Sequence, residues 1–321
     1  MARVLVTGGA GTIGSAVVRR LIGDADWEVR VSDQREPPQW MRESCEVHQG
    51  DLRDPVEARQ AVGDATHVIH LAAIVGGIGN FHKFPHTLLE MNTGLYNGVF
   101  RAALDRGVER LTYVSSSMVF ENATQFPTTE EYVREVPVPT SAYGFSKLAG
   151  ELYCRALNDE HGLAYTICRP FNAYGPGELP DHEPGIAHMV PDVIKKVLSG
   201  RRPLQIFGSG EQTRTITHVD DIAEGIVTAT AHPAAVNEDF NISNDEEMTV
   251  AEIARVIWEE CGEDPAMFEL EHLPSFEVDV QRRWPSVEKA KRLIGFETQI
   301  GVREGIRQTV EWMRGQPVVS A

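Results

Sequence analysis

The sequence is short of cysteine and of positive charge. Only four of its 321 residues are cysteines, and Cys45, Cys154, Cys168 and Cys261 do not stand at the spacing of paired metal ligands. We therefore expect reduced, mainly structural cysteines and no metal site. Lys and Arg number 30 against 47 Asp and Glu, for a formal net charge of −17. This balance disfavours partners that are nucleic acids or anionic membranes.

Long apolar runs are also missing. No stretch approaches the roughly 20 apolar residues that a membrane-spanning helix needs. The chain opens Met-Ala-Arg and passes directly into Val4-Leu5-Val6, without the pattern of a signal peptide. We therefore expect a cytoplasmic protein. With 42% hydrophobic and 24% charged residues, the composition is typical of a soluble globular protein of one large domain or two.

Short apolar runs alternate with helical patterns through the first half of the chain. Strand-like runs cover 4–6, 28–32, 67–71, 111–114 and 165–168, and helical stretches between them include 13–22, 88–106 and 143–160. Gly107 and Gly162 stand where helix C-terminal caps are expected. This alternation predicts an α/β protein with a Rossmann-type, doubly wound parallel sheet.

The pattern changes after about residue 170. Gly, Pro and His gather between 174 and 191, which predicts a loop-rich insertion, and short helices follow at 250–261, 286–293 and 303–312 with a short strand at 239–242. We divide the chain into a Rossmann domain, 1–170 with returning segments from about 205–245, and a smaller C-terminal α/β domain, 171–321, which is discontinuous.

A glycine loop, Gly8-x-x-Gly11-x-x-Gly14, follows the first strand and opens the first helix. Glycines at this spacing allow a tight turn and close approach of a pyrophosphate to the helix N-terminus. Asp33 ends the next strand, where a carboxylate accepts hydrogen bonds from adenosine ribose hydroxyls and repels a 2′-phosphate. The loop and its acid predict NAD, in preference to NADP, as the cofactor of the 1–170 domain.

Tyr143 and Lys147 are four residues apart on a predicted helix, so both side chains share one face. A nearby ammonium and an oxidised nicotinamide would both lower the pKa of a tyrosine, which is about 10 in water. Ser115-Ser116-Ser117 follows the strand 111–114, at the carboxyl edge of the sheet where ligands bind in such folds. A serine there can donate to a substrate oxygen while the tyrosine removes its proton.

With these motifs the chain resembles an extended short-chain dehydrogenase/reductase of the NAD-dependent nucleotide-sugar epimerase/dehydratase family. The resemblance extends over essentially all 321 residues. It is carried by 7–14, by 51–54 (Asp-Leu-Arg-Asp), by 70–73 (His-Leu-Ala-Ala), by 115–120, by Tyr143 and Lys147, and by 169–176. In that family the catalytic hydroxyl lies four residues before a tyrosine that Phe120 replaces here, so the resemblance assigns it to Ser116.

The resemblance also implies the binding residues. Those expected to hold NAD are Gly8, Gly11, Thr12, Ile13, Gly14, Asp33, Gln34, Asp51, Leu52, Leu71, Ala72, Ala73, Asn92, Ser115, Tyr143, Lys147 and Pro170. Those expected to hold a nucleoside-diphosphate sugar are Gly77, Ser116, Ser117, Asn172, Met189, Val190, Leu204, Phe207, Arg214 and Arg283. A homodimer is implied as well, through helices 88–106 and 143–160, which carry apolar residues on more than one face.

Departures from the family pattern select the reaction. Dehydratases carry Asp-Glu after the catalytic hydroxyl residue, and decarboxylases place a Glu where this chain has Met118. The 3,5-epimerase/reductases use a Cys at that position and a His or Lys where Gly177 stands. We therefore predict a 4-epimerase that uses Ser116, Tyr143, Lys147 and NAD.

Three alternatives remain open. The first alternative is a 3,5-epimerase, because the loop at 76–79 resembles that of GDP-fucose synthase and GDP-mannose 3,5-epimerase. Its candidate acid–base groups would be His82, Lys83, His182 and His188. A 4-keto-sugar reductase would bind NADP, against which Asp33 argues. A non-catalytic NAD-sensing module would have lost Tyr143 or Lys147. Neither the nucleotide base nor the sugar of the substrate can be identified from the sequence.

Overall fold

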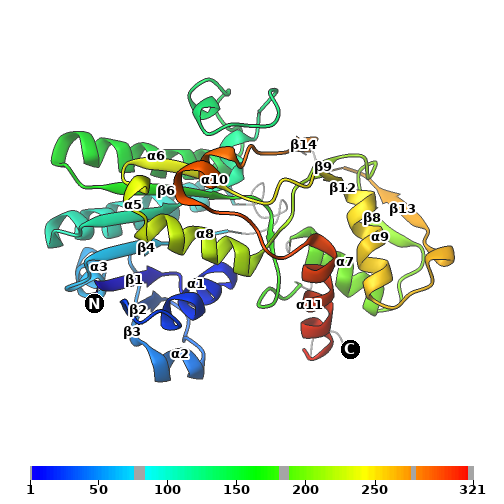
Figure 1. The fold of residues 1–321 in the computed structure, drawn as a ribbon, viewed down its shortest axis with the longest axis horizontal. Helices are drawn as coiled ribbons and strands as arrows, with labels where there is room; N and C mark the ends of the chain where they lie inside the picture. Colours follow the sequence, from blue (N-terminus) through cyan, green and yellow to red (C-terminus); the bar gives the residue numbers. More distant parts are fainter. Residues whose placement is uncertain (1, 76–83, 181–187, 276–279, 317–321) are drawn as a thin grey trace.

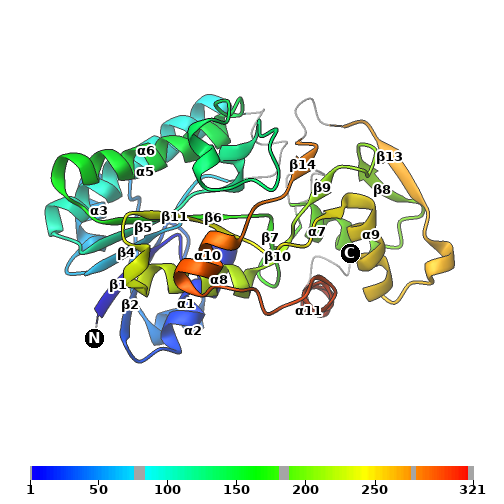
Figure 2. The same ribbon diagram turned by 45° about the horizontal axis from the view of Figure 1, so that its top comes forward.

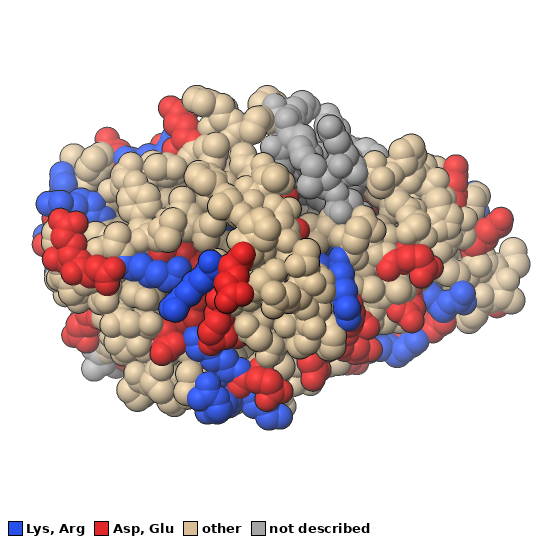
Figure 3. All heavy atoms as spheres, turned by 90° about the horizontal axis from the view of Figure 1, so that it is seen from above, with Lys and Arg blue, Asp and Glu red and all other residues tan. Residues whose placement is uncertain are grey.

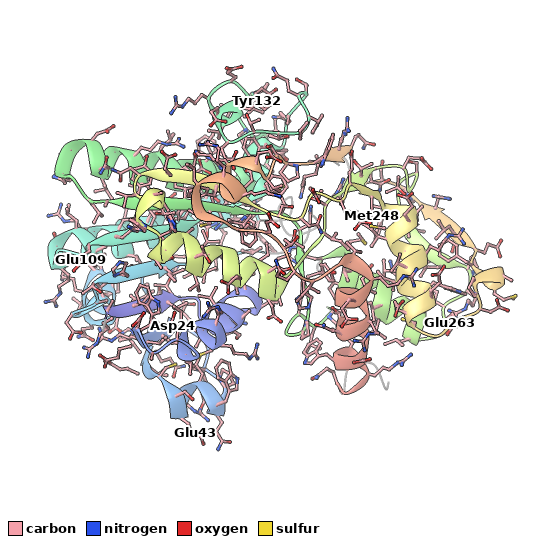
Figure 4. All side chains as sticks on the ribbon, viewed as in Figure 1. Asp24, Glu43, Glu109, Tyr132, Met248 and Glu263 are labelled. Carbon is pink, nitrogen blue, oxygen red and sulfur yellow. The ribbon has the colours of Figure 1, made fainter. Side chains whose placement is uncertain are left out.

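The computed structural model describes residues 2–75, 84–180, 188–275 and 280–316. A large lobe built on a sheet and a smaller lobe lie side by side in Figure 1. Figure 4 locates them by residue, with Asp24, Glu43 and Glu109 in the large lobe and Met248 and Glu263 in the smaller one. Among the helices of these described ranges, none combines the length and the apolar character that crossing a membrane requires.

Seven strands of the described residues form one parallel sheet in the large lobe, in the order β11-β6-β5-β4-β1-β2-β3. The order runs outward from β1 in both directions, which places a topological switch point between β1 and β4. This arrangement confirms the predicted Rossmann-type fold. The strands are β1 (Ala2–Thr7), β2 (Trp27–Asp33), β3 (Glu46–Gln49), β4 (His67–His70), β5 (Arg110–Val114), β6 (Tyr165–Pro170) and β11 (Glu238–Ile242).

Helices cover both faces of this sheet, as Figures 1 and 2 show. Val4 and Val6 of β1 face one layer and Leu5 faces the other, because side chains alternate along a strand. The first layer contains α1 (Thr12–Ile22), α2 (Gln39–Ser44), α8 (Val219–Ala231) and α10 (Glu288–Ile294). The second contains α3 (Pro55–Val62), α5 (Pro85–Arg106) and α6 (Ala142–His161).

The smaller lobe has its own core around the fully buried Trp258. Its helices are α7 (Met189–Leu198), α9 (Val250–Glu260) and α11 (Val302–Arg314). Short strands pair as β8 (Leu204–Phe207) with β13 (Leu270–Leu273), and as β9 (Thr213–Arg214) with β12 (Met248–Thr249) and β14 (Arg282–Arg283). β7 (Ala173–Tyr174) and β10 (Thr217–His218) form a two-stranded parallel link.

Segments from the second half of the chain return to the large lobe. Of the stretch 205–245, α8 packs on the large sheet and β11 is the edge strand of that sheet, next to β6. β8 instead pairs with β13 in the smaller lobe. α10 also returns and buries Ala290 and Ile294 against the α1 layer. The proposed domain limits at residues 170 and 171 stay a prediction.

Most predicted helix limits lie within two or three residues of the observed ones. α5 begins at Pro85 instead of residue 88, because proline suits the first turn of a helix. Gly107 and Gly162 are left-handed at φ 69° and 75°, as helix-capping glycines are. The loop predicted to reach residue 191 is wrong at its end, since α7 starts at Met189.

The surface seen in Figure 3 mixes Lys and Arg with Asp and Glu instead of gathering charges of one sign. The four cysteines are free. Burial raises the thiol pKa of Cys168 and of Cys261 to about 12, which makes both unreactive at neutral pH.

Candidate functional site

A cavity of about 960 Å³ lies between the two lobes. Its lining starts at the glycine loop, passes the carboxyl ends of β4, β5 and β6, and reaches α7, β8, β9 and β14. A cavity of this size matches the upper range of small-molecule sites, and its position at the strand ends is the one that open α/β sheets use for ligands.

The glycine loop forms a cradle that larger residues would fill. A Cβ on Gly8 would lie 2.8 Å from the backbone of Ala72, and one on Gly14 would lie 2.2 Å from the carbonyl oxygen of Gly8. Gly11 is the N-cap of α1 and offers no side-chain cap, so the backbone N–H groups of the first turn face the cavity with no capping side chain. These features fit the pyrophosphate of a dinucleotide.

Asp33 lies beside this loop at the end of β2. Its carboxylate accepts hydrogen bonds from the backbone N–H of Ala10 at 3.0 Å and of Arg35 at 2.9 Å. These bonds fix the acid at the cavity edge, where it is only 9% exposed. The position fits an adenosine ribose, as the sequence predicted. Arg35 also lines the cavity.

The three serines after β5 have different surroundings. The Ser115 hydroxyl donates to the buried Glu151 Oε1 at 2.7 Å. The Ser116 hydroxyl bonds the Tyr143 side chain and caps the short helix 117–120 by accepting from the Met118 N–H. All three line the cavity. This geometry favours Ser116 as the serine that acts with the tyrosine.

Tyr143 is buried at the start of α6. Burial raises its pKa above the ordinary value, whereas the hydrogen bond with Ser116 and the charge of Arg283 lower it. The sequence had pointed to Lys147 as the cation that stabilises the phenolate. In the structure the Lys147 ammonium lies 5.9 Å from the centre of the Tyr143 ring, and Arg283 is the cation that acts on the hydroxyl.

Lys147 lies one turn further along α6 and is also buried. Its ammonium donates to the Val114 carbonyl at 2.9 Å, and burial lowers its pKa from 10.5 to about 7. A lysine with such a pKa changes its charge near neutral pH, which is the range in which acid–base catalysis operates.

Two of the expected cofactor residues do not line the cavity. Asp51 is held by a bidentate pair with Arg53, and Arg53 lines the cavity in its place. Asn92 is fully buried and braces the loop after β4, since it accepts from the Ile74 N–H at 2.7 Å and donates to Ser146 Oγ at 3.1 Å. The remaining expected NAD residues all line the cavity.

Arg283 and Asn172 both line the cavity and contact each other. The Arg283 guanidinium donates to Asn172 Oδ1 at 3.1 Å and to the Met118 sulfur at 2.9 Å. The Arg214 guanidinium donates to two backbone carbonyls, those of Thr213 and Val280. Both arginines line the cavity from short strands, Arg214 from β9 and Arg283 from β14.

The expected base-packing residues divide into two groups. Met189 and Phe207 line the cavity, whereas Val190 and Leu204 lie in the core of the smaller lobe. Strand and helix periodicity explains this. Leu204 and Phe207 are an odd number of positions apart on β8 and so face opposite sides, and the successive helix residues Met189 and Val190 point in different directions around α7. Gly77 lies outside the described residues, as do His82, Lys83 and His182.

His188, a candidate acid–base group of the sequence, lines the cavity, and it does so beside residues that the sequence did not point to. One of these is Glu178, whose Oε1 lies 2.6 Å from His188 Nδ1. The carboxylate raises the pKa of His188. Lys196 pairs with Asp192 at 2.7 Å and lies 5.1 Å over the Phe207 ring. Only the i,i+4 spacing of Asp192 and Lys196 was a readable signal.

Several known proteins are similar to this one in sequence and in fold. UDP-glucuronic acid decarboxylase 1 of Xenopus tropicalis is 30% identical, over 97% of this chain and 72% of that protein. A putative UDP-glucose 4-epimerase of Methanocaldococcus jannaschii is 30% identical, over 97% and 98%. The crystal structure of UDP-glucose 4-epimerase from Thermotoga maritima with UDP-glucose has a TM-score of 0.87 and 30% identity, over 97% of this chain and 98% of that one.

The family profile described as NAD dependent epimerase/dehydratase family matches residues 4–243, most of the chain. Both the sheet order and the cradle for a dinucleotide agree with that match. The protein is therefore an NAD-dependent enzyme of the short-chain dehydrogenase/reductase type and belongs to the NAD dependent epimerase/dehydratase family.

Proposed function

We propose that the protein is a nucleotide-sugar 4-epimerase. The observation that supports this best is the meeting of Ser116 and Tyr143, with Lys147 one turn away, in the same cavity as the glycine cradle. The 4-epimerases among its relatives and structural neighbours agree with this reading.

Tyr143 is the proposed base of the reaction. It takes the proton of the sugar 4-hydroxyl and gives it back to the same oxygen after inversion. Ser116, already bonded to the phenol, donates to that oxygen and holds it beside the base. NAD, when bound in the glycine cradle, would supply the hydride acceptor and donor that the protein side chains lack. No net oxidation results.

The proposed substrate class is supported by two arginines and two apolar side chains that line the cavity. Arg214 and Arg283 offer guanidinium groups to a diphosphate, and Asn172 is held between Arg283 and the Thr215 carbonyl. Phe207 and Met189 offer apolar surface to a nucleotide base. We therefore propose a nucleoside-diphosphate sugar as substrate, bound with its sugar toward Tyr143.

Met118 argues against two related reactions. Its side chain lines the cavity beside Ser116 and contacts Arg283 through sulfur. A thioether can neither give nor take a proton, so it cannot replace the acid that dehydration needs or the Glu of the decarboxylases.

A 3,5-epimerase is the second candidate, and one observation favours it. His188 and Glu178 form an ion-paired couple in the cavity, and the charge of Arg283 acts on His188. A histidine whose pKa is raised by a carboxylate can move a proton at neutral pH.

Isotope retention tests the proposal. A nucleotide sugar carrying deuterium at C4 is expected to keep that deuterium at C4 of the inverted product, because hydrogen leaves and returns within one closed site. In deuterated water no solvent deuterium is expected at C3 or C5. Proton NMR of the product reports all three positions.

Solvent deuterium at C3 or C5 would instead establish the 3,5-epimerase and overturn the 4-epimerase. His188→Gln is the matched variant for that outcome, since it removes the acid–base couple and leaves Ser116, Tyr143 and Lys147 in place. A 4-epimerase is expected to keep C4 inversion in this variant.

We further propose that the enzyme works as a homodimer in the cytoplasm. The support for a dimer is an apolar face of α6 formed by Phe145, Leu148 and Leu152.

A further inference from the structure

A buried carboxylate without a proposed role lies one helical turn beyond Lys147. Glu151 has a fully buried side chain, and it stands four residues after Lys147 on α6. Residues four apart lie on one face of a helix, so Tyr143, Lys147 and Glu151 form a column. The column runs from the cavity into the interior of the large lobe.

Three strong hydrogen bonds fix the Glu151 carboxylate. Its Oε1 accepts from Ser115 Oγ at 2.7 Å and from Arg169 Nε at 2.7 Å, and its Oε2 accepts from Arg169 Nη2 at 2.7 Å. A bidentate Arg–carboxylate pair is rigid and strong. The Glu151 carboxylate is therefore held in a fixed position, in contact with Ser115 and Arg169.

The same arginine has a second carboxylate partner. Arg169 Nη2 also donates to Asp239 Oδ2 at 2.7 Å, and Asp239 accepts from Lys289 at 2.6 Å. Asp239 belongs to β11, on the far side of β6 from the active-site serines. The chain thus offers two acids on one guanidinium, of which only Glu151 shares a helix face with Lys147.

The titratable side chains near Lys147 come from α6, β5 and β4. On α6 it has Tyr143 and Glu151; from β5 the Tyr113 ring lies 5.4 Å from its ammonium; and from β4 it faces His70. Burial lowers the pKa of Lys147 and the charge of Glu151 raises it. His70 is kept neutral by burial, which leaves Glu151 as the anion acting on Lys147 among these groups.

We propose that Glu151 is a positioning residue that keeps a proton on Lys147 at the pH at which the enzyme works. The inference rests on the proposed role of Lys147 beside Tyr143. Without the acid, a buried ammonium with one carbonyl partner loses its proton at lower pH. An uncharged Lys147 would take one positive charge away from the buried part of the cavity that it lines.

Competitive labelling of the holoenzyme tests this without any sugar substrate. Trace acetic anhydride is applied across pH 5–10, and acetylation at Lys147 is located by mass spectrometry, which gives the midpoint of its titration. In Glu151→Gln we expect that midpoint to fall by about one pH unit or more, the size of shift that loss of a nearby opposite charge produces. Asp239→Asn, which removes the other acid of Arg169, is expected to leave the midpoint where it is.

An unchanged midpoint in Glu151→Gln, or an equal fall in both variants, would overturn the proposal. If Glu151→Gln does not fold, Glu151→Asp decides: its carboxylate is withdrawn by one methylene, so a smaller fall of the same sign is expected, and no fall would refute it. Because labelling needs no turnover, failure of the 4-epimerase proposal would leave this result standing.

Discussion

At the scale of the residue, the site depends on how buried polar groups are paired. Tyr143 is buried, and burial alone works against a phenolate. Two features oppose it, the Ser116 hydroxyl and the Arg283 guanidinium, and both reach the phenol from other parts of the chain. The hydroxyl of Tyr143 is therefore the atom on which the proposed chemistry depends most.

Replacing Tyr143 by Phe removes this hydroxyl and keeps the ring. We expect turnover to fall by about 10²–10⁴-fold, the usual contribution of a positioned base. NAD binding is expected to persist, since the cradle is unchanged. Turnover on the true substrate, with bound NAD measured by native mass spectrometry, checks both. Near-normal turnover would remove Tyr143 from its role.

His70 gives a second prediction at this scale. It is fully buried, its Nδ1 lies 2.9 Å from Thr7 Oγ1, and burial lowers its pKa from 6.5 to about 3. The unfolded chain takes up a proton at this histidine below pH 6.5 while the folded chain does not. The free energy of unfolding is therefore expected to fall between pH 6.5 and 3, by up to about 1.4 kcal/mol per pH unit from this group.

Urea unfolding at pH 7.5 and at pH 5 measures this loss. In His70→Gln the difference between the two pH values is expected to shrink. His161→Gln, at the exposed end of α6, serves as the control and is expected to keep the wild-type difference. Equal pH dependence in all three proteins would contradict the role of His70.

At the scale of the element, α6 is the part that joins the chemistry to the fold. Ser141 caps it by accepting from the Gly144 N–H at 3.0 Å, and its buried face presents Tyr143, Lys147 and Glu151 in succession. The helix lies close against β5 because Gly150 has no side chain there. A Cβ at Gly150 would lie 2.4 Å from the Tyr113 hydroxyl oxygen and ring.

Gly150→Ala is expected to destabilise the protein. Tyr113 cannot move aside easily, since it is fully buried and its hydroxyl is bonded to Tyr96 at 2.9 Å. Overpacking costs roughly 1–3 kcal/mol, which outweighs the gain of up to about 1 kcal/mol from replacing glycine in a helix. Urea unfolding measures the net loss.

Gly23→Ala is the matched control. A Cβ there would meet its nearest neighbour, the Arg20 carbonyl oxygen, only at 3.6 Å, and Gly23 has an ordinary φ of −72°. Its unfolding free energy is expected to stay near that of the wild type. If Gly150→Ala proved as stable as this control, the close packing of α6 on β5 would not be needed.

At the scale of the whole molecule, the outer face of α6 is apolar. Phe145 and Leu152 are 47% and 56% exposed, and the half-buried Leu148 lies between them on the same face. The sequence suggested the same for α5, but the exposed residues in its middle, Asn97 and Arg101, are polar. A second copy of the chain covering α6 would remove this apolar face from water.

Leu152→Glu is therefore expected to produce monomers, because it would place a charge within the proposed apolar contact. Met267→Glu, at a 67% exposed position of the smaller lobe, is expected to leave the dimer intact. Sedimentation velocity at micromolar concentration distinguishes the two. A wild-type protein that sediments only as a monomer would refute the dimer.

Much of this molecule could be predicted because its signals are local. The strand–glycine–helix pattern predicts the cradle, since the three glycines and the first helix lie within 15 residues. Alternation of strands with helices predicts the parallel sheet, because parallel strands require crossover connections. The spacing of Tyr143 and Lys147 predicts a shared face for the same local reason.

Other parts of the site depend on contacts between distant segments, which only the tertiary structure decides. Glu151 meets Arg169 and Ser115 across three elements, and Arg283 approaches Tyr143 from 140 positions further along the chain. In the sequence, Glu151 and Arg169 look like ordinary charges. Only the fold buries them together, and burial is what turns a common charge into one that sets the protonation of a neighbour. The sequence by itself therefore determined the cofactor cradle and the spacing of the proposed reacting groups, and the tertiary structure decided how those groups are held.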